Sequence, residues 1–116
     1  MYRYHAEILK VVDGDTLDVR IDLGFKMTTE QRVRLRGIDT PEIWRQKKDS
    51  EEYKKGKAAS DYVKQRLAQN NNEFIIETTK EAGVYGRYLA TVFLPDAAQS
   101  LNDELVEKGL ARVYKS

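Results

Sequence analysis

The sequence predicts a mainly β fold with helices (α+β), in which five strands form a barrel covered by two or three helices. Five short segments are β-branched or alternate apolar and polar residues. One longer segment has apolar residues at helical spacing, and it falls between the third and fourth strands. We expect the 116 residues to form a single domain, residues 1–116.

The first half of the chain predicts three consecutive strands. Residues 6–12 (AEILKVV) are apolar and β-branched, and an Asp-Gly turn at 13–16 leads into the alternating residues 17–22 (LDVRID), which is typical of a hairpin. Residues 23–31 predict a loop whose ends can extend the flanking strands. Residues 32–38 (RVRLRGI) predict a third strand with its apolar side chains inward and its three arginines outward.

The second half predicts a helix, two strands and a second helix. Residues 51–69 carry the helical spacing, and strands are predicted at 73–79 and 87–94. Ser100 opens an S-x-x-D cap for a short helix that ends at Gly109. A helix between strands three and four is the arrangement of the OB-fold, which is the leading candidate, and a split α+β sheet is the alternative.

Composition narrows the class of protein. Hydrophobic residues make up 41% of the chain and charged residues 34%, which is ordinary for a globular protein. No apolar run could span a bilayer and the N-terminus does not resemble a signal peptide, so we expect no membrane partner and either an intracellular protein or a trimmed form of an exported one. The lack of cysteine excludes disulfides and thiol chemistry. The net charge of +1 argues against a globally basic nucleic-acid binder.

The stretch GIDTPE, residues 37–42, gathers candidate metal ligands. Asp39 follows the third strand, and Pro41 biases Thr40 toward an extended backbone, which also fixes the Thr40 carbonyl. Asp15 extends the inward row of the second strand to the mouth of the barrel. Two carboxylates and a carbonyl are hard oxygen ligands that suit Ca²⁺, with water or a substrate phosphate completing the shell. The alternative is plain turn chemistry in both segments.

Three further side chains are candidate catalytic residues. Glu42 is close enough in sequence to reach a water at such a site, as a general base or as the residue that positions the water. Arg34, on the polar face of the third strand, and Arg87, at the start of the fifth, offer guanidinium groups to phosphate oxygens. Taken singly, each arginine is more often a solvated surface residue.

Four motifs in order along the chain resemble those of the staphylococcal nuclease (thermonuclease) family. The joint pattern is specific at these separations, although any one motif alone is not. The resemblance implies an OB-fold, calcium-dependent phosphodiesterase that cuts DNA and RNA and leaves 3′-phosphate and 5′-hydroxyl ends. The motifs are VVDGDT (11–16), RLRGIDTPE (34–42), YGR (85–87) and LNDELVEKGLARVY (101–114).

Carried over by position, the resemblance assigns both metal ligands and catalytic residues. It adds Tyr85 as a contact to the nucleotide and Tyr114 as a base-stacking residue, which suits an unpaired DNA or RNA substrate and little sequence specificity. Val84 departs from the pattern, because the thermonuclease has a lysine there, and this bears on substrate affinity. The implied Ca²⁺ ligands are Asp15, Asp39 and the Thr40 carbonyl, and the implied catalytic residues are Arg34, Glu42 and Arg87.

Two other interpretations stay open at this point. One is a nucleic-acid or peptide-binding OB module without catalysis, against which stands the full set of candidate catalytic residues. The other is that the chain is the catalytic piece of a larger protein. The sequence does not distinguish DNA from RNA as the preferred substrate, and we expect a monomer.

Overall fold

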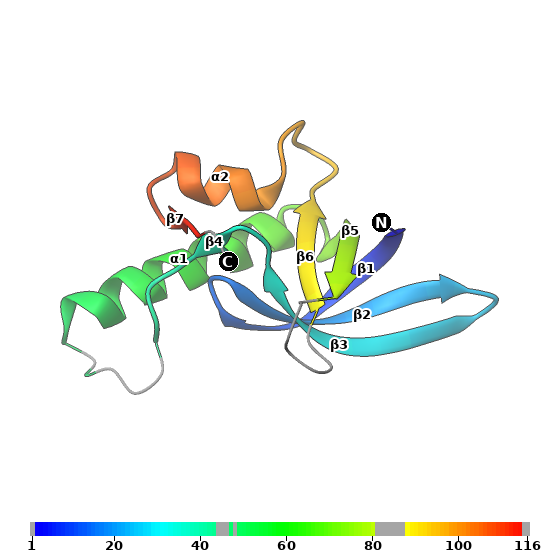
Figure 1. Cartoon of the computed structure of the whole chain (residues 1–116), viewed down its shortest axis with the longest axis horizontal. Coiled ribbons are helices and arrows are strands. Elements are labelled where there is room, and N and C mark those ends of the chain that lie inside the picture. The colour runs from blue at the N-terminus through cyan, green and yellow to red at the C-terminus, as the bar shows by residue number, and fades with distance from the viewer. Residues whose placement is uncertain (1, 44–46, 48, 81–87, 115–116) are drawn as a thin grey trace.

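The chain forms a closed five-stranded barrel, as the sequence predicts (Figure 1). The computed structural model describes residues 2–43, 47, 49–80 and 88–114. The barrel strands are β1 (Tyr2–Asp13), β2 (Thr16–Gly24), β3 (Met27–Leu35), β5 (Glu73–Lys80) and β6 (Tyr88–Phe93). They close in the order β1-β2-β3-β6-β5, and every pair is antiparallel except β3 with β6, which is parallel. This mixed barrel agrees with the predicted OB-fold.

Two helices and a small second sheet complete the fold. Helix α1 (Glu51–Ala68) stands between the third and fourth barrel strands in sequence, and α2 (Leu101–Glu107) follows β6. The short strands β4 (Ile38–Asp39) and β7 (Arg112–Val113) pair antiparallel. Figure 1 draws this pair between α1 and α2. The pairing brings the exit of β3 together with a segment far downstream in the sequence.

Both helices begin at a serine that caps them. The Ser50 hydroxyl accepts a hydrogen bond from the Tyr53 N–H, and the Ser100 hydroxyl accepts one from the Asp103 N–H, each at 3.1 Å. Each contact satisfies one of the backbone donors that a helix N-terminus leaves free. The cap predicted at Ser100 is therefore confirmed, and α1 ends one residue before the predicted boundary.

The apolar core fills the barrel and extends beneath the helices. The predicted inward residues Leu17, Val19, Ile21, Val33 and Leu35 are all buried, as period-2 alternation requires. Four apolar side chains from the helices join this core: Val63, Leu67, Leu101 and Leu105. None of the helices that the structure describes is long and apolar enough to cross a membrane.

The hairpin of β2 and β3 corrects the prediction for residues 23–31 and 32–38. Most of the first range is strand, because the hairpin turns tightly at Gly24–Lys26 with positive φ angles of 79°, 55° and 60°. In residues 32–38 the barrel strand β3 ends at Leu35, and the chain becomes extended again in β4 after a turn. Turn conformation at a non-glycine residue is hard to read from sequence, since Phe25 gives no such signal. The tip extends beyond the barrel (Figure 1).

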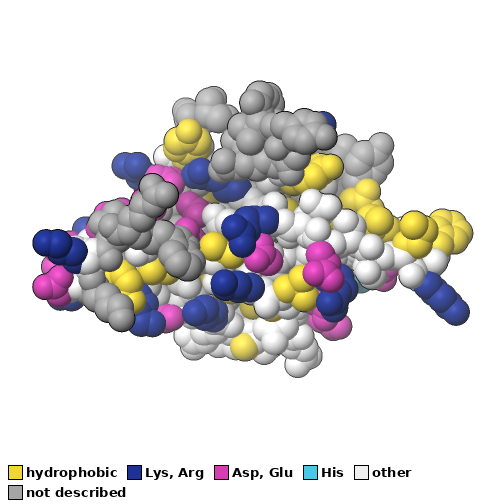
Figure 2. All heavy atoms as spheres, turned by 90° about the horizontal axis from the view of Figure 1, so that it is seen from below, with side chains coloured by type: hydrophobic (Ala, Val, Ile, Leu, Met, Phe, Trp, Pro, Cys, Tyr) yellow, Lys and Arg dark blue, Asp and Glu magenta, His cyan; other side chains and the backbone are white. Residues whose placement is uncertain are grey.

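The tip of this hairpin exposes apolar side chains. Phe25 is 98% exposed, and Leu23 and Met27 are also exposed. Figure 2 shows hydrophobic side chains gathered at this projecting end of the molecule, with a basic side chain beside them. The tip lies at the opposite end of β2 and β3 from Asp15 and Arg34, so it takes no part in the candidate site described below.

Candidate functional site

Asp15 lies at the barrel mouth, in the tight turn between β1 and β2. The residue is only 8% exposed, and its Oδ2 accepts a hydrogen bond from the Thr40 N–H at 3.1 Å while its Oδ1 accepts one from the Thr16 hydroxyl at 3.0 Å. The turn fits here because Gly14 has no side chain: a Cβ at this position would lie 2.8 Å from the Cβ of Ala59 on α1. The structure thus brings Asp15 against Thr40.

Arg34 and Asp39 meet beside this turn. Arg34 pairs with Thr16 across the β2–β3 register, and its Nη2 donates to Asp39 Oδ1 at 3.1 Å and to the Ile38 carbonyl at 3.1 Å. The same nitrogen lies 3.8 Å from Asp15 Oδ2. The side chain of Arg34 is 21% exposed. One guanidinium therefore stands between two carboxylates.

Tyr114 lies over Arg34. The Arg34 Cζ is 5.0 Å from the centre of the Tyr114 ring, and the Tyr114 N–H donates to the Gly37 carbonyl at 2.8 Å. A guanidinium stacked on an aromatic face is held in one plane and keeps its edge donors available. The backbone contact with Gly37 continues the pairing of β4 with β7 and explains why a C-terminal tyrosine reaches the site.

Glu42 is exposed and less closely engaged. Its backbone N–H donates to Glu52 Oε1 at 3.2 Å, and its carboxylate makes no hydrogen bond or ion pair within the ranges that the structure describes. Two further predicted site residues, Tyr85 and Arg87, lie outside the described residues, as does Val84. Their placement therefore remains a prediction from the sequence.

Arg112 belongs to the cluster and was not singled out from the sequence. Asp39 and Arg112 are directly opposite each other in the β4–β7 pair, and the Nε and Nη2 of Arg112 donate to Asp39 Oδ2 at 3.2 and 3.0 Å. Arg112 lies in the motif at residues 101–114, but its contact with Asp39 depends on the two-residue strand β7. Such a short pairing leaves no periodicity to detect.

Asp13 also belongs to the cluster and was not singled out from the sequence, where residues 13–16 were interpreted as a turn. Its Oδ1 is buried and has no hydrogen-bond partner within the described part of the chain. Burial raises the pKa of Asp13, the negative charge of Asp15 and then that of Glu42 raise it further, and a hydrogen bond with the backbone of Ile43 opposes them. The signal that could have found it is its position two residues before Asp15, on the same side of the turn.

A family model described as "Staphylococcal nuclease homologue" matches residues 32–116. The chain belongs to the staphylococcal nuclease homologue family. The match begins at Arg32 near the end of β3 and runs through β4, α1, β5, β6, α2 and β7, so it includes Arg34, Asp39 and Arg112. Family membership agrees with the barrel topology and confirms the resemblance seen in the sequence motifs.

Three of the proteins similar to this chain carry nuclease names. Thermonuclease of Staphylococcus intermedius is 38% identical over 106 residues, which cover 90% of this chain and 56% of the relative. Thermonuclease of Staphylococcus hyicus is 36% identical over 107 residues, covering 91% and 57%. Endonuclease YhcR of Bacillus subtilis (strain 168) is 31% identical over 114 residues, covering 96% and 9%. This chain therefore spans little more than half the length of the thermonucleases that it matches.

The cluster at the barrel mouth has oxygen donors that fit a hard divalent cation. The carboxylates of Asp13, Asp15 and Asp39 and the Thr40 carbonyl are oxygen ligands, and Asp13 Oδ1 and Thr40 Oγ1 are buried without a hydrogen-bond partner in the described ranges. No three acidic or histidine side chains among the described residues already converge in ligand geometry. Both oxygens of Asp39 accept hydrogen bonds from arginines. The chemistry of the donors fits Ca²⁺.

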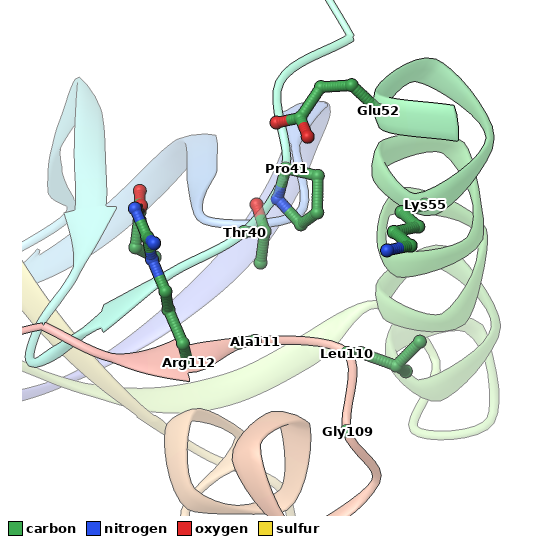
Figure 3. Close-up of a pocket in the computed structure, with 9 residues that line it drawn as sticks. Thr40, Pro41, Glu52, Lys55, Gly109, Leu110, Ala111 and Arg112 are labelled. Carbon is green, nitrogen blue, oxygen red and sulfur yellow. Dashed lines mark hydrogen bonds and ion pairs between the residues drawn. The ribbon is translucent and has the colours of Figure 1, made fainter. Parts of the chain in front are cut away.

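A cavity of about 400 Å³ opens beside Asp39 (Figure 3). Arg112 enters it from β7, and Glu52 and Lys55 enter it from α1, so its walls carry both signs of charge. Lys55 makes no hydrogen bond or ion pair in the part of the chain that the structure describes. The remaining lining is Thr40, Pro41, Gly109, Leu110 and Ala111.

Proposed function

We propose that this chain is a calcium-dependent nuclease, acting as a monomer, that hydrolyses phosphodiester bonds of DNA, RNA or both with little sequence specificity. The products carry 3′-phosphate and 5′-hydroxyl ends. The observation that carries the proposal is the guanidinium of Arg34 held between Asp39 at 3.1 Å and Asp15 at 3.8 Å at the barrel mouth. An arginine beside a cluster of oxygen ligands suits an anionic substrate bridged by a cation. The thermonuclease relatives support the same class of reaction.

Asp15, Asp39 and the Thr40 carbonyl are the proposed calcium ligands. Asp15 is oriented by the Thr40 N–H and the Thr16 hydroxyl, so its carboxylate is already directed at the site. Asp13 lies close enough to Asp15 for their charges to interact, and it would add negative charge around the ion. When bound, Ca²⁺ supplies positive charge that stabilises the phosphate oxygens in the transition state.

Arg34 and Arg87 are the proposed phosphate-binding residues. Arg34 is anchored by the Ile38 carbonyl and by the Tyr114 ring, so its guanidinium is oriented before substrate arrives. Fixed donors of this kind stabilise charge that develops in the transition state at no cost in reorganisation. The role of Arg87 rests on its position in the YGR motif and on the family resemblance.

Glu42 is the proposed general base. Its exposed carboxylate can take a proton from the attacking water, whose oxygen forms the new bond to phosphorus. The bond between phosphorus and the 5′-oxygen then breaks, and that oxygen gains a proton. Hydrolysis of the bond to the 5′-oxygen gives a 3′-phosphate and a 5′-hydroxyl.

Tyr114 and Tyr85 are the proposed contacts to the bases. The Tyr114 ring is partly exposed and lies over Arg34, so a base stacked on its free face would have its phosphate near the guanidinium. Stacking accepts any base but requires it to be unpaired, which favours single-stranded DNA or RNA.

Digestion of single-stranded DNA and of RNA tests the proposal. The purified protein should cut one or both with Ca²⁺ and stop when EGTA is added. Arg34→Ala should lose turnover, whereas Arg32→Ala should not, because Arg32 on the same strand face pairs with Asp18 at 2.8 Å and lies away from the cluster. Binding without cleavage, or cleavage that persists in EGTA, would overturn the proposal and favour a binding module or a different chemistry.

A further inference from the structure

We propose that Arg112 is a built-in competitor of the divalent cation at Asp39, so that it lowers the affinity of the site for Ca²⁺. The inference rests on the proposed calcium site and adds a residue that determines how tightly that site binds its ion. The observation behind it is that Asp39 Oδ2, a proposed ligand atom, accepts two hydrogen bonds from one guanidinium.

Both oxygens of Asp39 are occupied by cationic groups. Arg34 takes Oδ1 at 3.1 Å, and Arg112 takes Oδ2 at 3.2 and 3.0 Å. A carboxylate paired in this way has its charge largely neutralised, and a cation that binds at Oδ2, where Arg112 donates twice, must displace that guanidinium. Ion binding at Asp39 is therefore an exchange of one cation for another.

The two arginines differ in how easily they can leave. Arg34 is largely buried, donates to the Ile38 carbonyl and stacks on Tyr114, so it has other contacts to keep it in place. The side chain of Arg112 is 81% exposed, and Asp39 is its only hydrogen-bond or ion-pair partner in the described portion of the chain. Arg112 is thus the arginine that the cation displaces from Asp39.

The backbone keeps Arg112 close to Asp39 even after the exchange. The two residues are directly opposite in the β4–β7 pair, so the carboxylate stays within reach of the guanidinium. The adjoining cavity of about 400 Å³ gives the released side chain room, and Figure 3 shows Arg112 at its edge with Lys55 across it. A retained guanidinium both competes for Asp39 and repels the incoming ion.

Calcium titration by isothermal calorimetry tests the inference on the whole chain without substrate. Arg112→Gln removes the charge but keeps a polar side chain of similar length. Because exposed ion pairs are weak, we expect its dissociation constant for Ca²⁺ to fall by about two- to fivefold. Arg112→Lys should return the constant toward that of the unaltered protein.

Lys55→Gln is the matched control. It removes one positive charge from the same cavity, but Lys55 does not contact Asp39. Its dissociation constant should stay close to that of the unaltered protein. If Lys55→Gln tightens binding as much as Arg112→Gln, the effect is that of general charge, and direct competition is wrong. Thermal unfolding without Ca²⁺ checks that each variant is folded.

An NMR measurement reports the exchange directly. The Nε–H signal of Arg112 should shift when Ca²⁺ is added, because its acceptor Asp39 is taken away, whereas the Nε–H signal of Arg66, bonded to Glu104, should not. If the unaltered protein binds Ca²⁺ but Arg112→Gln binds it equally or more weakly, this inference fails and the proposed function stands. If neither protein binds Ca²⁺, the proposed calcium site fails and the inference falls with it.

Discussion

Arg66 and Arg34 are both largely buried arginines that face two carboxylates, yet their surroundings differ. Arg66, on α1, donates to Asp96 at 2.7 and 2.8 Å and to Glu104 at 3.0 and 3.2 Å, and Tyr62 donates to Glu104 as well. These hydrogen bonds join α1 to α2 and to the loop that precedes α2. The Asp96 contact is the main cause of the raised pKa of Arg66, so this arginine keeps its charge.

The Arg34 cluster is less completely satisfied. Its contacts to Asp39 and Asp15 are 3.1 and 3.8 Å, and two nearby oxygens, Asp13 Oδ1 and Thr40 Oγ1, are buried without a hydrogen-bond partner in the described residues. Buried polar groups without a hydrogen bond cost stability, so the two regions differ in how completely their polar groups are satisfied. The comparison teaches that the ion pairs of Arg66 are short, whereas those of Arg34, a proposed phosphate-binding residue, are longer and lie near unsatisfied oxygens.

The largest expected effect comes from Arg34→Ala. Turnover of single-stranded DNA should fall by about 10²- to 10³-fold, because a donor fixed at the developing charge is lost. Stability should change by less than about 1 kcal/mol, since Asp39 keeps its bonds from Arg112 and Asp15 keeps its bonds from Thr16 and Thr40. Single-turnover kinetics and urea unfolding measure the two quantities. A variant that loses stability but keeps its turnover would place Arg34 with Arg66 as a structural residue.

Arg66→Leu should have the opposite profile. It leaves the largely buried Glu104 without its positively charged partner and should lower the free energy of unfolding by about 3 kcal/mol. Turnover at a temperature where the variant is folded should match that of the unaltered protein. Urea unfolding is the measurement, and replacing Glu104 by Leu in the same chain should restore part of the loss, since it removes the unpaired charge.

Asn102→Ala tests the contact between α2 and the barrel. The buried amide of Asn102 donates to the Arg36 and Ala90 carbonyls at 2.9 and 3.0 Å, and its oxygen accepts from the Val92 N–H at 3.1 Å. Truncation removes the side-chain partner of the Arg36 carbonyl and of the Val92 N–H, whereas the Ala90 carbonyl keeps its bond from the Arg36 N–H. It should lower the free energy of unfolding by about 2 kcal/mol. Hydrogen exchange should show faster opening at Val92. An unchanged exchange rate there would argue that water replaces the amide.

The smallest effect is that of Asp96→Asn, and it depends on pH. The hydrogen bond from Arg66 lowers the pKa of Asp96 below its ordinary value of 3.8. A carboxylate with a lowered pKa stabilises the fold above the unfolded value, and this contribution disappears as the pH falls through the folded value. The variant should therefore be less stable at pH 7, and the difference should close below pH 3.8. A difference in melting temperature that is independent of pH would contradict this.

The barrel was largely predictable from the sequence, because its strands alternate strictly and its helices carry clear caps. Leu17, Val19 and Ile21 defined one face of β2 without ambiguity, and Ser100 defined the start of α2. The pairing of β4 with β7 was not predictable. Two residues in each strand carry no periodicity, and the pairing depends on where the whole barrel places them.

Site residues to which the sequence motifs assign a role could be predicted. Site residues that are recognised only by their contacts in the folded protein were missed. Asp15, Arg34 and Asp39 lie in recognisable stretches, and the structure brings them together. Asp13 and Arg112 act through burial and through a cross-strand register, which a linear pattern does not record. The roles of all these residues stay predictions until the variants are measured.

The pairing of β4 with β7 also has a consequence for the order in which the protein matures. Asp15, Arg34 and Asp39 leave the ribosome early, while Arg112 and Tyr114 are made far later and join them only through β7. A domain generally folds as a unit, and the mouth of this barrel includes a strand that is made long after Asp15, Arg34 and Asp39. The barrel mouth is therefore completed only after β7 has been made, and until then Arg34 lacks the aromatic ring that stacks on it.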